Sequence, residues 1–165
     1  MVAPDCSLQF TSMSQPEDDL PVPPGFQTIH HGGPYFAALG PVYGKPAEDG
    51  SGTQVVALRV QHKHTNVLGV THGGMLATLA DCALGMNVVL QRDPPQSMVT
   101  VSLTSDFLSS AKPGEWLEAH VTIRRQGARL AFAECLLQVE DRVILRASGV
   151  FSVTGREPVK PRVKL

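Results

Sequence analysis

The chain has 165 residues, 42% of them hydrophobic, and a formal net charge of −1. This length and composition are typical of a single globular domain with one substantial core, and they argue against wholesale disorder. The near-neutral charge, with no long run of like charges, makes nucleic acid a poor candidate for the main partner. It still allows a small phosphate-bearing ligand, which needs only a few local cations.

Three widely spaced cysteines, Cys6, Cys82 and Cys135, form neither a disulfide framework nor a zinc-ligand pattern. We therefore expect reduced thiols and a cytoplasmic location. The first ten residues lack the basic and apolar regions of a signal peptide. The longest apolar helix candidate is interrupted by Asp81, so we expect no membrane partner.

The first part of the chain predicts a tail followed by strands. Residues 1–25 are rich in proline, serine and acidic residues, which favours an extended or disordered tail. Residues 26–47 hold short apolar pieces divided by glycines and predict a short strand or irregular cover. Residues 45–52 resemble a turn, and the valine-rich residues 54–61 predict a strand.

A long helix and four strands are predicted next. Residues 71–90 contain mostly Leu, Ala and Met without proline, and predict one buried helix with Thr71 as a possible cap. Alternation then predicts strands at residues 98–107 and 116–124. Residues 130–139 are apolar on both faces, as in a central strand, and residues 143–153 are expected to form the last strand of this meander before a tail at residues 154–165. The domain at residues 26–153 is therefore α+β. A single sheet on a single helix needs further cover, so we expect an oligomer.

Asp81 is the only charged residue between Gly74 and Leu90, in a helix that is otherwise apolar nearly all round. Such a helix should be buried, where a carboxylate is costly unless it is paired or used. Isolated carboxylates in such places are often functional. The alternative is a structural carboxylate that local hydrogen bonds satisfy.

The His72-Gly73-Gly74 segment lies where the predicted helix begins. Glycine lets the backbone approach a ligand, and the first N–H groups of a helix are unpaired and carry partial positive charge. The Gly73 N–H is therefore a candidate oxyanion donor, although a tight turn explains the glycines equally well. A second copy, His31-Gly32-Gly33, precedes no apolar helix and is interpreted as a loop.

Gly73 and Asp81 are eight residues apart, which corresponds to about 12 Å along a helix axis. A donor and a base must both approach one reacting centre to about 3 Å. One helix cannot easily supply both groups, whereas two antiparallel helices can. The spacing therefore suggests active sites shared across a dimer interface.

The spacing of several short motifs resembles the hotdog-fold acyl-CoA thioesterases of the PaaI type. The motifs are His64-Thr65-Asn66, Gly69, His72-Gly73-Gly74, Leu79-Ala80-Asp81 and the strand at residues 99–103. The resemblance covers roughly residues 50–153, and residues 25–43 more loosely. It implies a hotdog fold, with one long central helix wrapped by an antiparallel sheet of five to six strands. It also implies a dimer of dimers, a homotetramer with composite sites.

The resemblance further implies hydrolysis of acyl-CoA thioesters to a free acid and coenzyme A. Asp81 would be the general base or nucleophile, and the Gly73 N–H the oxyanion hole. Asn66 would orient the carbonyl or the water, and His72 would support the loop and polarise the carbonyl. Thr100 would hold the catalytic water. Structural alternatives remain: Asn66 as a turn residue, His72 as a loop support and Thr100 as an ordinary strand residue.

No cofactor is expected, since coenzyme A is part of the substrate. No metal is expected either, because His62, His64 and His72 lack a carboxylate or thiolate at ligand spacing. Candidate cations for the coenzyme A phosphates are Lys112, Arg124, Arg125 and Arg129. Candidate lining residues for the acyl group are Met75, Met86, Phe107 and Leu108, whose types do not specify the acyl chain.

Two other functions remain open on the same fold. One is a hydratase or dehydratase of 3-hydroxyacyl thioesters, which usually needs a histidine and an acid on different elements. The other is a non-catalytic acyl-CoA binding module, which loss of Asp81 would have favoured. The combination of Asn66, Gly73 and Asp81 fits the thioesterase better.

Overall fold

The computed structural model describes residues 20–154. Most of the two predicted tails, and Cys6, therefore lie outside the described residues. The described part of the first tail runs close to the sheet: Arg59 donates a hydrogen bond of 2.6 Å from Nη2 to the Pro21 carbonyl. Phe26, at the end of this segment, packs edge-on against Trp116.

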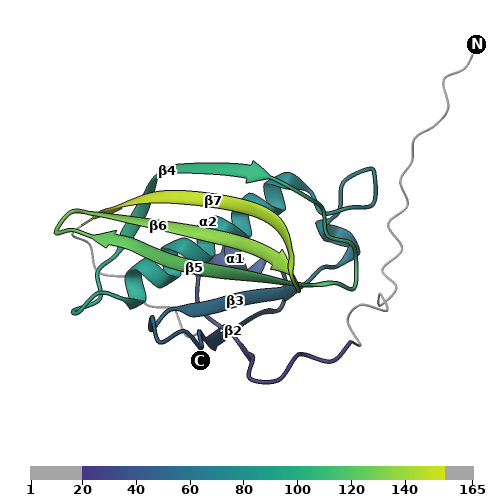
Figure 1. The fold of residues 1–165 in the computed structure, drawn as a ribbon, viewed down its shortest axis with the longest axis horizontal. Helices are drawn as coiled ribbons and strands as arrows, with labels where there is room; N and C mark the ends of the chain where they lie inside the picture. Colours follow the sequence, from purple (N-terminus) through teal and green to yellow (C-terminus); the bar gives the residue numbers. More distant parts are fainter. Residues whose placement is uncertain (1–19, 155–165) are drawn as a thin grey trace, which may run out of the picture.

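One antiparallel sheet wraps the long helix α2 (Figure 1), which confirms the predicted α+β architecture. The sheet has seven strands, slightly more than the five to six expected, in the order β1-β2-β3-β5-β6-β7-β4. The strands are β1 Gln27–Thr28, β2 Val42–Pro46, β3 Gln54–Arg59, β4 Met98–Phe107, β5 Trp116–Gln126, β6 Leu130–Val139 and β7 Arg142–Val153. The helices are α1 Gly33–Ala37, the 3-10 turn η2 His62–His64 and α2 Gly73–Leu90.

The four later strands do not form the predicted meander. β5, β6 and β7 are consecutive neighbours, but β4 pairs with β7 at the far edge, and β5 pairs with β3 instead. Residues 108–115 make this possible by carrying the chain from the edge strand β4 past β7 and β6 to β5. Within residues 20–154, β4 is consequently an edge strand with a hydrogen-bonded neighbour on one side only.

Helix α2 supplies one side of the core. Leu76, Leu79, Ala80, Ala83 and Leu84 are buried against inward-facing residues of the sheet. The other side of α2 is only half-buried, so the expected complete burial is wrong for a single chain. By length and composition α2 could also span a membrane, but here it packs as the core helix of the sheet.

Asn87 ties the C-terminal half of α2 to the sheet. Its side chain is fully buried, accepts a hydrogen bond of 2.6 Å from the Gln54 N–H and donates to the Gln54 carbonyl at 3.0 Å. The same amide nitrogen donates to the Ala83 carbonyl within the helix. The amide thus satisfies polar groups that would otherwise be buried alone.

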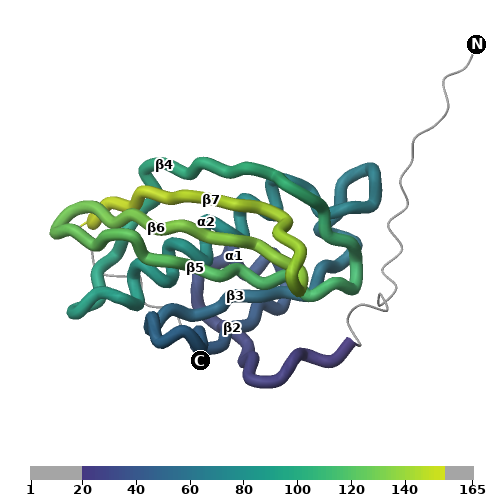
Figure 2. Tube along the Cα trace, viewed as in Figure 1, coloured from purple at the N-terminus to yellow at the C-terminus, as the bar shows by residue number. Residues whose placement is uncertain are grey.

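The first HGG copy was expected to be a loop, but a short helix follows it. α1 begins at Gly33, with Pro34 in its first turn and Phe36 buried beneath it. Proline suits the first helical positions, and burial of Phe36 fixes the turn in place. The tube in Figure 2 shows α1 close to α2, where the Tyr35 hydroxyl lies 3.3 Å from the Thr78 hydroxyl oxygen.

Candidate active site

His72, not Thr71, caps the N-terminus of α2. His72 has extended backbone angles, and its Nδ1 accepts a hydrogen bond of 2.9 Å from the Gly74 N–H. Thr71 is buried one residue earlier, with its hydroxyl accepting from the Ala111 N–H at 3.1 Å. The chain is still extended at Thr71 because its own N–H bonds the Ala111 carbonyl. The HGG segment is thus held in place from both sides.

The Gly73 N–H is left without an acceptor among the described residues, because the cap satisfies Gly74 instead. This N–H belongs to the first helical residue, where the helix carries partial positive charge. Phe107 lies directly over this position: a Cβ added to Gly73 would stand 3.2 Å from the Phe107 ring. The Gly73 N–H is therefore a free hydrogen-bond donor that lies next to the Phe107 ring.

Asn66 forms a tight turn just before the HGG segment. Its Oδ1 accepts from the Leu68 N–H at 2.9 Å, and its backbone N–H donates to the Val70 carbonyl at 2.8 Å. This is the turn role that the sequence left open. The bond through Oδ1 still leaves the amide nitrogen without an acceptor among the described residues, so a donor remains available.

Asp81 and Thr100 meet across the gap between α2 and β4. The Thr100 hydroxyl donates a hydrogen bond of 2.8 Å to Asp81 Oδ1. Thr100 pairs with Phe151, a core residue, so its side chain points toward the helix. A register shift between Thr100 and Ser102 locally bends β4 at this point, as β-bulges beside functional sites often do.

The five candidate residues therefore form two groups in one chain. Asn66, His72 and Gly73 gather at the head of α2, while Asp81 and Thr100 meet more than two turns further along. Their spacing on one helix of 18 residues keeps the carboxylate and the free N–H about 12 Å apart. A single chain does not bring them together.

The sequence predicts no catalytic role for one residue near the site. His64 is buried, with 4% of its surface exposed, and both ring nitrogens are bonded to backbone groups. Burial lowers its pKa from the ordinary value, while the bond to Leu39 opposes this and Lys63 reinforces it. The motif His64-Thr65-Asn66 is visible in the sequence, but the bond from the His64 ring to the Leu39 carbonyl, 25 residues earlier, is not.

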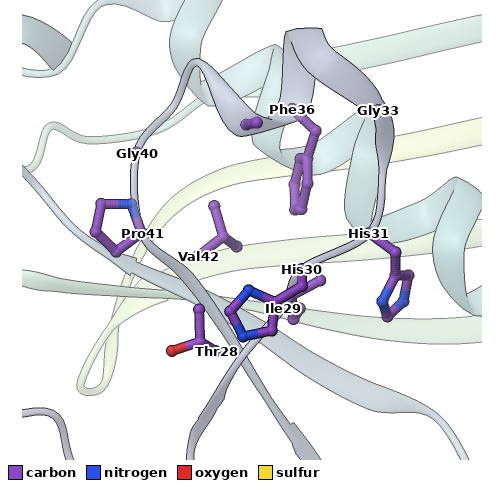
Figure 3. Close-up of a pocket in the computed structure, with 10 residues that line it drawn as sticks. Thr28, Ile29, His30, His31, Gly33, Phe36, Gly40, Pro41 and Val42 are labelled. Carbon is purple, nitrogen blue, oxygen red and sulfur yellow. The ribbon is translucent and has the colours of Figure 1, made fainter. Parts of the chain in front are cut away.

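A hollow of about 260 Å³ lies elsewhere, between α1 and strands β1 and β2 (Figure 3). His30 and His31 lie on its rim, and Phe36 and Val42 form part of its apolar lining. Its lining contains none of the five candidate residues. Within residues 20–154, no group of three or more His, Cys, Asp or Glu side chains is arranged to hold a metal.

The candidate acyl-lining residues differ in exposure. Met75 is buried, Met86 is partly buried, and Phe107 and Leu108 are more than half exposed at the end of β4. Among the candidate phosphate ligands, Arg124 is paired with Glu134 at 2.6 Å. That ion pair raises the pKa of Arg124 and lowers that of Glu134.

Sequence comparison finds relatives of known class. The family model of the thioesterase superfamily matches residues 68–145. PA0474 of Pseudomonas aeruginosa, named as a candidate esterase, is 45% identical over 130 residues, which cover 79% of this chain and 96% of that protein. Mouse acyl-coenzyme A thioesterase 13 is 38% identical over 80 residues, which cover 48% of this chain and 56% of that protein.

Two solved structures share the fold. PaaI from the phenylacetic acid degradation operon of Escherichia coli superimposes with a TM-score of 0.58 at 25% identity, covering 62% of this chain and 72% of PaaI. BH2602 of Bacillus halodurans, solved with CoA, gives 0.64 at 28% identity, covering 76% and 82%. The chain is thus a hotdog-fold member of the thioesterase superfamily. Within it the chain belongs to the PaaI type and is a thioesterase enzyme.

Proposed function

We propose that this protein hydrolyses acyl-CoA thioesters, with Asp81 as the general base. The observation that carries the proposal is the bond from Thr100 to Asp81 Oδ1, because it orients a half-buried carboxylate and leaves Oδ2 for a water molecule. The thioesterase name of the mouse relative and the CoA in the BH2602 structure support a CoA substrate.

The reaction uses the two residue groups in one step. Asp81 takes a proton from water as the water oxygen attacks the thioester carbonyl carbon. The Gly73 N–H receives the developing oxyanion, while the Asn66 amide and His72 Nε2–H donate to the same carbonyl or to the water. The C–S bond then breaks, and the proton passes from Asp81 to the departing sulfur of coenzyme A.

The active site is proposed to form between two chains. The edge strand β4 exposes Val99 and Val101, at 54% and 61%, beside the half-buried face of α2 that carries Asp81. Pairing of two such edges about a two-fold axis would extend the sheet and set two α2 helices antiparallel. Asp81 of one chain would then face Gly73 of its partner in a dimer, or in a dimer of dimers.

The test is release of free thiol from a panel of acyl-CoAs of different length and aromaticity. Asp81→Asn keeps the shape and the bond to Thr100 but removes the base, so kcat should fall about 10²–10⁴-fold. Asp106→Asn is the matched control, because Asp106 is exposed and paired with Arg146 on the other face of β4. Wild-type turnover by Asp81→Asn would rule out the mechanism, and absence of turnover by the wild type would favour a binding module.

A further inference from the structure

His64 connects three segments around the head of α2. Its Nε2 lies 2.7 Å from the Leu39 carbonyl oxygen, just after α1. Its Nδ1 accepts a hydrogen bond of 3.0 Å from the Gln61 N–H at the start of η2. Its own carbonyl accepts a bond of 2.8 Å from the His72 N–H. One buried residue thus joins α1, η2 and the cap of α2.

These contacts define the chemical form of the ring. A carbonyl oxygen can only accept, so Nε2 must carry the proton, and a backbone N–H can only donate, so Nδ1 must be bare. The ring is therefore the neutral Nε2–H tautomer. Protonation at Nδ1 would break the bond to Gln61 and place a charge in a buried site beside Lys63.

The path from His64 to the candidate oxyanion donor is short. The His64 carbonyl holds the backbone of His72, and the ring of His72 in turn occupies the Gly74 N–H. In this arrangement the Gly73 N–H at the helix end has no acceptor among the described residues. A displacement of His64 would move the cap, and displacement of a catalytic donor by about 1 Å can cost about 10²-fold in rate.

We infer that His64, in its neutral form, is a positioning residue that sets the direction of the Gly73 N–H and so tunes the chemical step. The inference rests on the proposed function, in which Gly73 receives the oxyanion. His64 itself touches no substrate. Its effect should therefore be seen in kcat, while KM for the acyl-CoA changes little.

Three substitutions separate the two ring bonds. His64→Gln places an amide nitrogen near Nε2 and keeps the donor to Leu39, whereas His64→Asn places an oxygen near Nδ1 and keeps the acceptor for Gln61. His64→Ala removes both. We expect kcat to fall about 10–100-fold in His64→Ala with KM within about twofold, and partial rescue in the other two variants. The matched control is His62→Gln, an exposed histidine of the same turn.

The wild-type protein provides a second readout that does not depend on how a variant folds. Long-range ¹H–¹⁵N spectra of histidine-labelled protein should show His64 as the Nε2–H tautomer, still neutral at about pH 6.5, where a free imidazole is half protonated. Titration of His64 at the pH of a free imidazole would overturn the inference, and so would a kcat within twofold of wild type in His64→Ala. If Asp81→Asn stays active, the proposed function fails; if only the His64 variants keep full kcat, this inference alone fails.

Discussion

Thr100 on the edge strand donates a hydrogen bond of 2.8 Å to Asp81 on the central helix. The two residues are 19 positions apart in the chain and belong to different elements, and β4 reaches α2 only by pairing with β7. The expected role of Thr100 in holding the catalytic water stays a prediction, because a hydroxyl that donates to the carboxylate can still accept from water. Its proposed role is also to orient the base.

Thr100→Val should lower kcat about tenfold, because the base keeps its charge but loses its fixed orientation. Thr104→Val is the matched control on the same strand, since Thr104 pairs with Ser148 on the opposite face of the sheet. Steady-state thiol release measures both variants. Equal activity of the two would remove Thr100 from the site.

The Gly73 N–H can be deleted with little change of backbone. Gly73 is the first residue of α2, and His72 before it has φ −71° and ψ 133°, so proline is compatible at position 73. Gly73→Pro should cost about 10²–10³-fold in kcat if this N–H is the oxyanion donor. Gly73→Ala adds a similar contact with Phe107 but keeps the N–H, so the ratio between the two variants isolates the donor. A ratio near one would show that the N–H plays no part.

Mixing two inactive variants tests whether the site spans two chains. Random pairing of Asp81→Asn chains with Gly73→Pro chains should restore about a quarter of wild-type activity, because half of the dimers each regain one complete site. Asp81→Asn mixed with Asp81→Ala should restore none. Activity is measured after unfolding and refolding the mixture. A site contained within one chain predicts no recovery in either mixture.

Asn87→Leu should destabilise the fold by about 3 kcal/mol, because the N–H and carbonyl of Gln54 lose their partners in a part-buried site. In a domain of this size that corresponds to a fall in melting temperature of roughly 6–12 °C. Gln91→Leu is the control, since Gln91 is exposed and makes one long bond of 3.2 Å to Ser51. Calorimetry or thermal circular dichroism measures both, and equal melting temperatures would contradict the role given to Asn87.

Stability should also depend on pH through His64. Its pKa is lowered in the folded chain from 6.5, mainly by burial, so the unfolded chain binds the proton more readily. The contribution of His64 to the free energy of unfolding should therefore be fully present above about pH 6.5 and should decline as the pH falls below that value. Carboxylates with a lowered pKa, such as Glu118 beside His120, change the free energy of unfolding only below about pH 4.5. Urea unfolding at several pH values should show a flatter profile for His64→Gln between pH 6.5 and 5 than for wild type.

The sequence predicted the elements well because their signals are local. The alternation in residues 98–107 and the apolar residues at 130–139 match the bounds of β4 and β6, and the apolar run before Pro94 matches α2. The position of β4 at the far edge could not be predicted, since strand order depends on long-range pairing. Thr71 was a reasonable cap by residue type, but its hydroxyl is taken by Ala111, which no local pattern reveals.

The sequence predicted which residues belong to the candidate site, but not how they are arranged in space. Asn66, His72 and Gly73 gather because they are close in sequence around one helix end. The sequence indicates neither the bond between Thr100 and Asp81 nor the contact of the His64 ring with Leu39. Both depend on contacts between segments that lie 19 and 25 residues apart in the chain.

Among the described residues, Thr100 lies on a strand that is paired on one side only, and this position affects how the enzyme loses its activity. In a separated chain, an edge strand such as β4 opens more readily than the central strands, and this fraying needs no loss of the core. Mild denaturant or dilution would then remove the bond that orients Asp81, while the amide protons of α2 and of the other strands stay protected from exchange. Catalytic activity would thus be lost at a lower denaturant concentration than the one that unfolds the core.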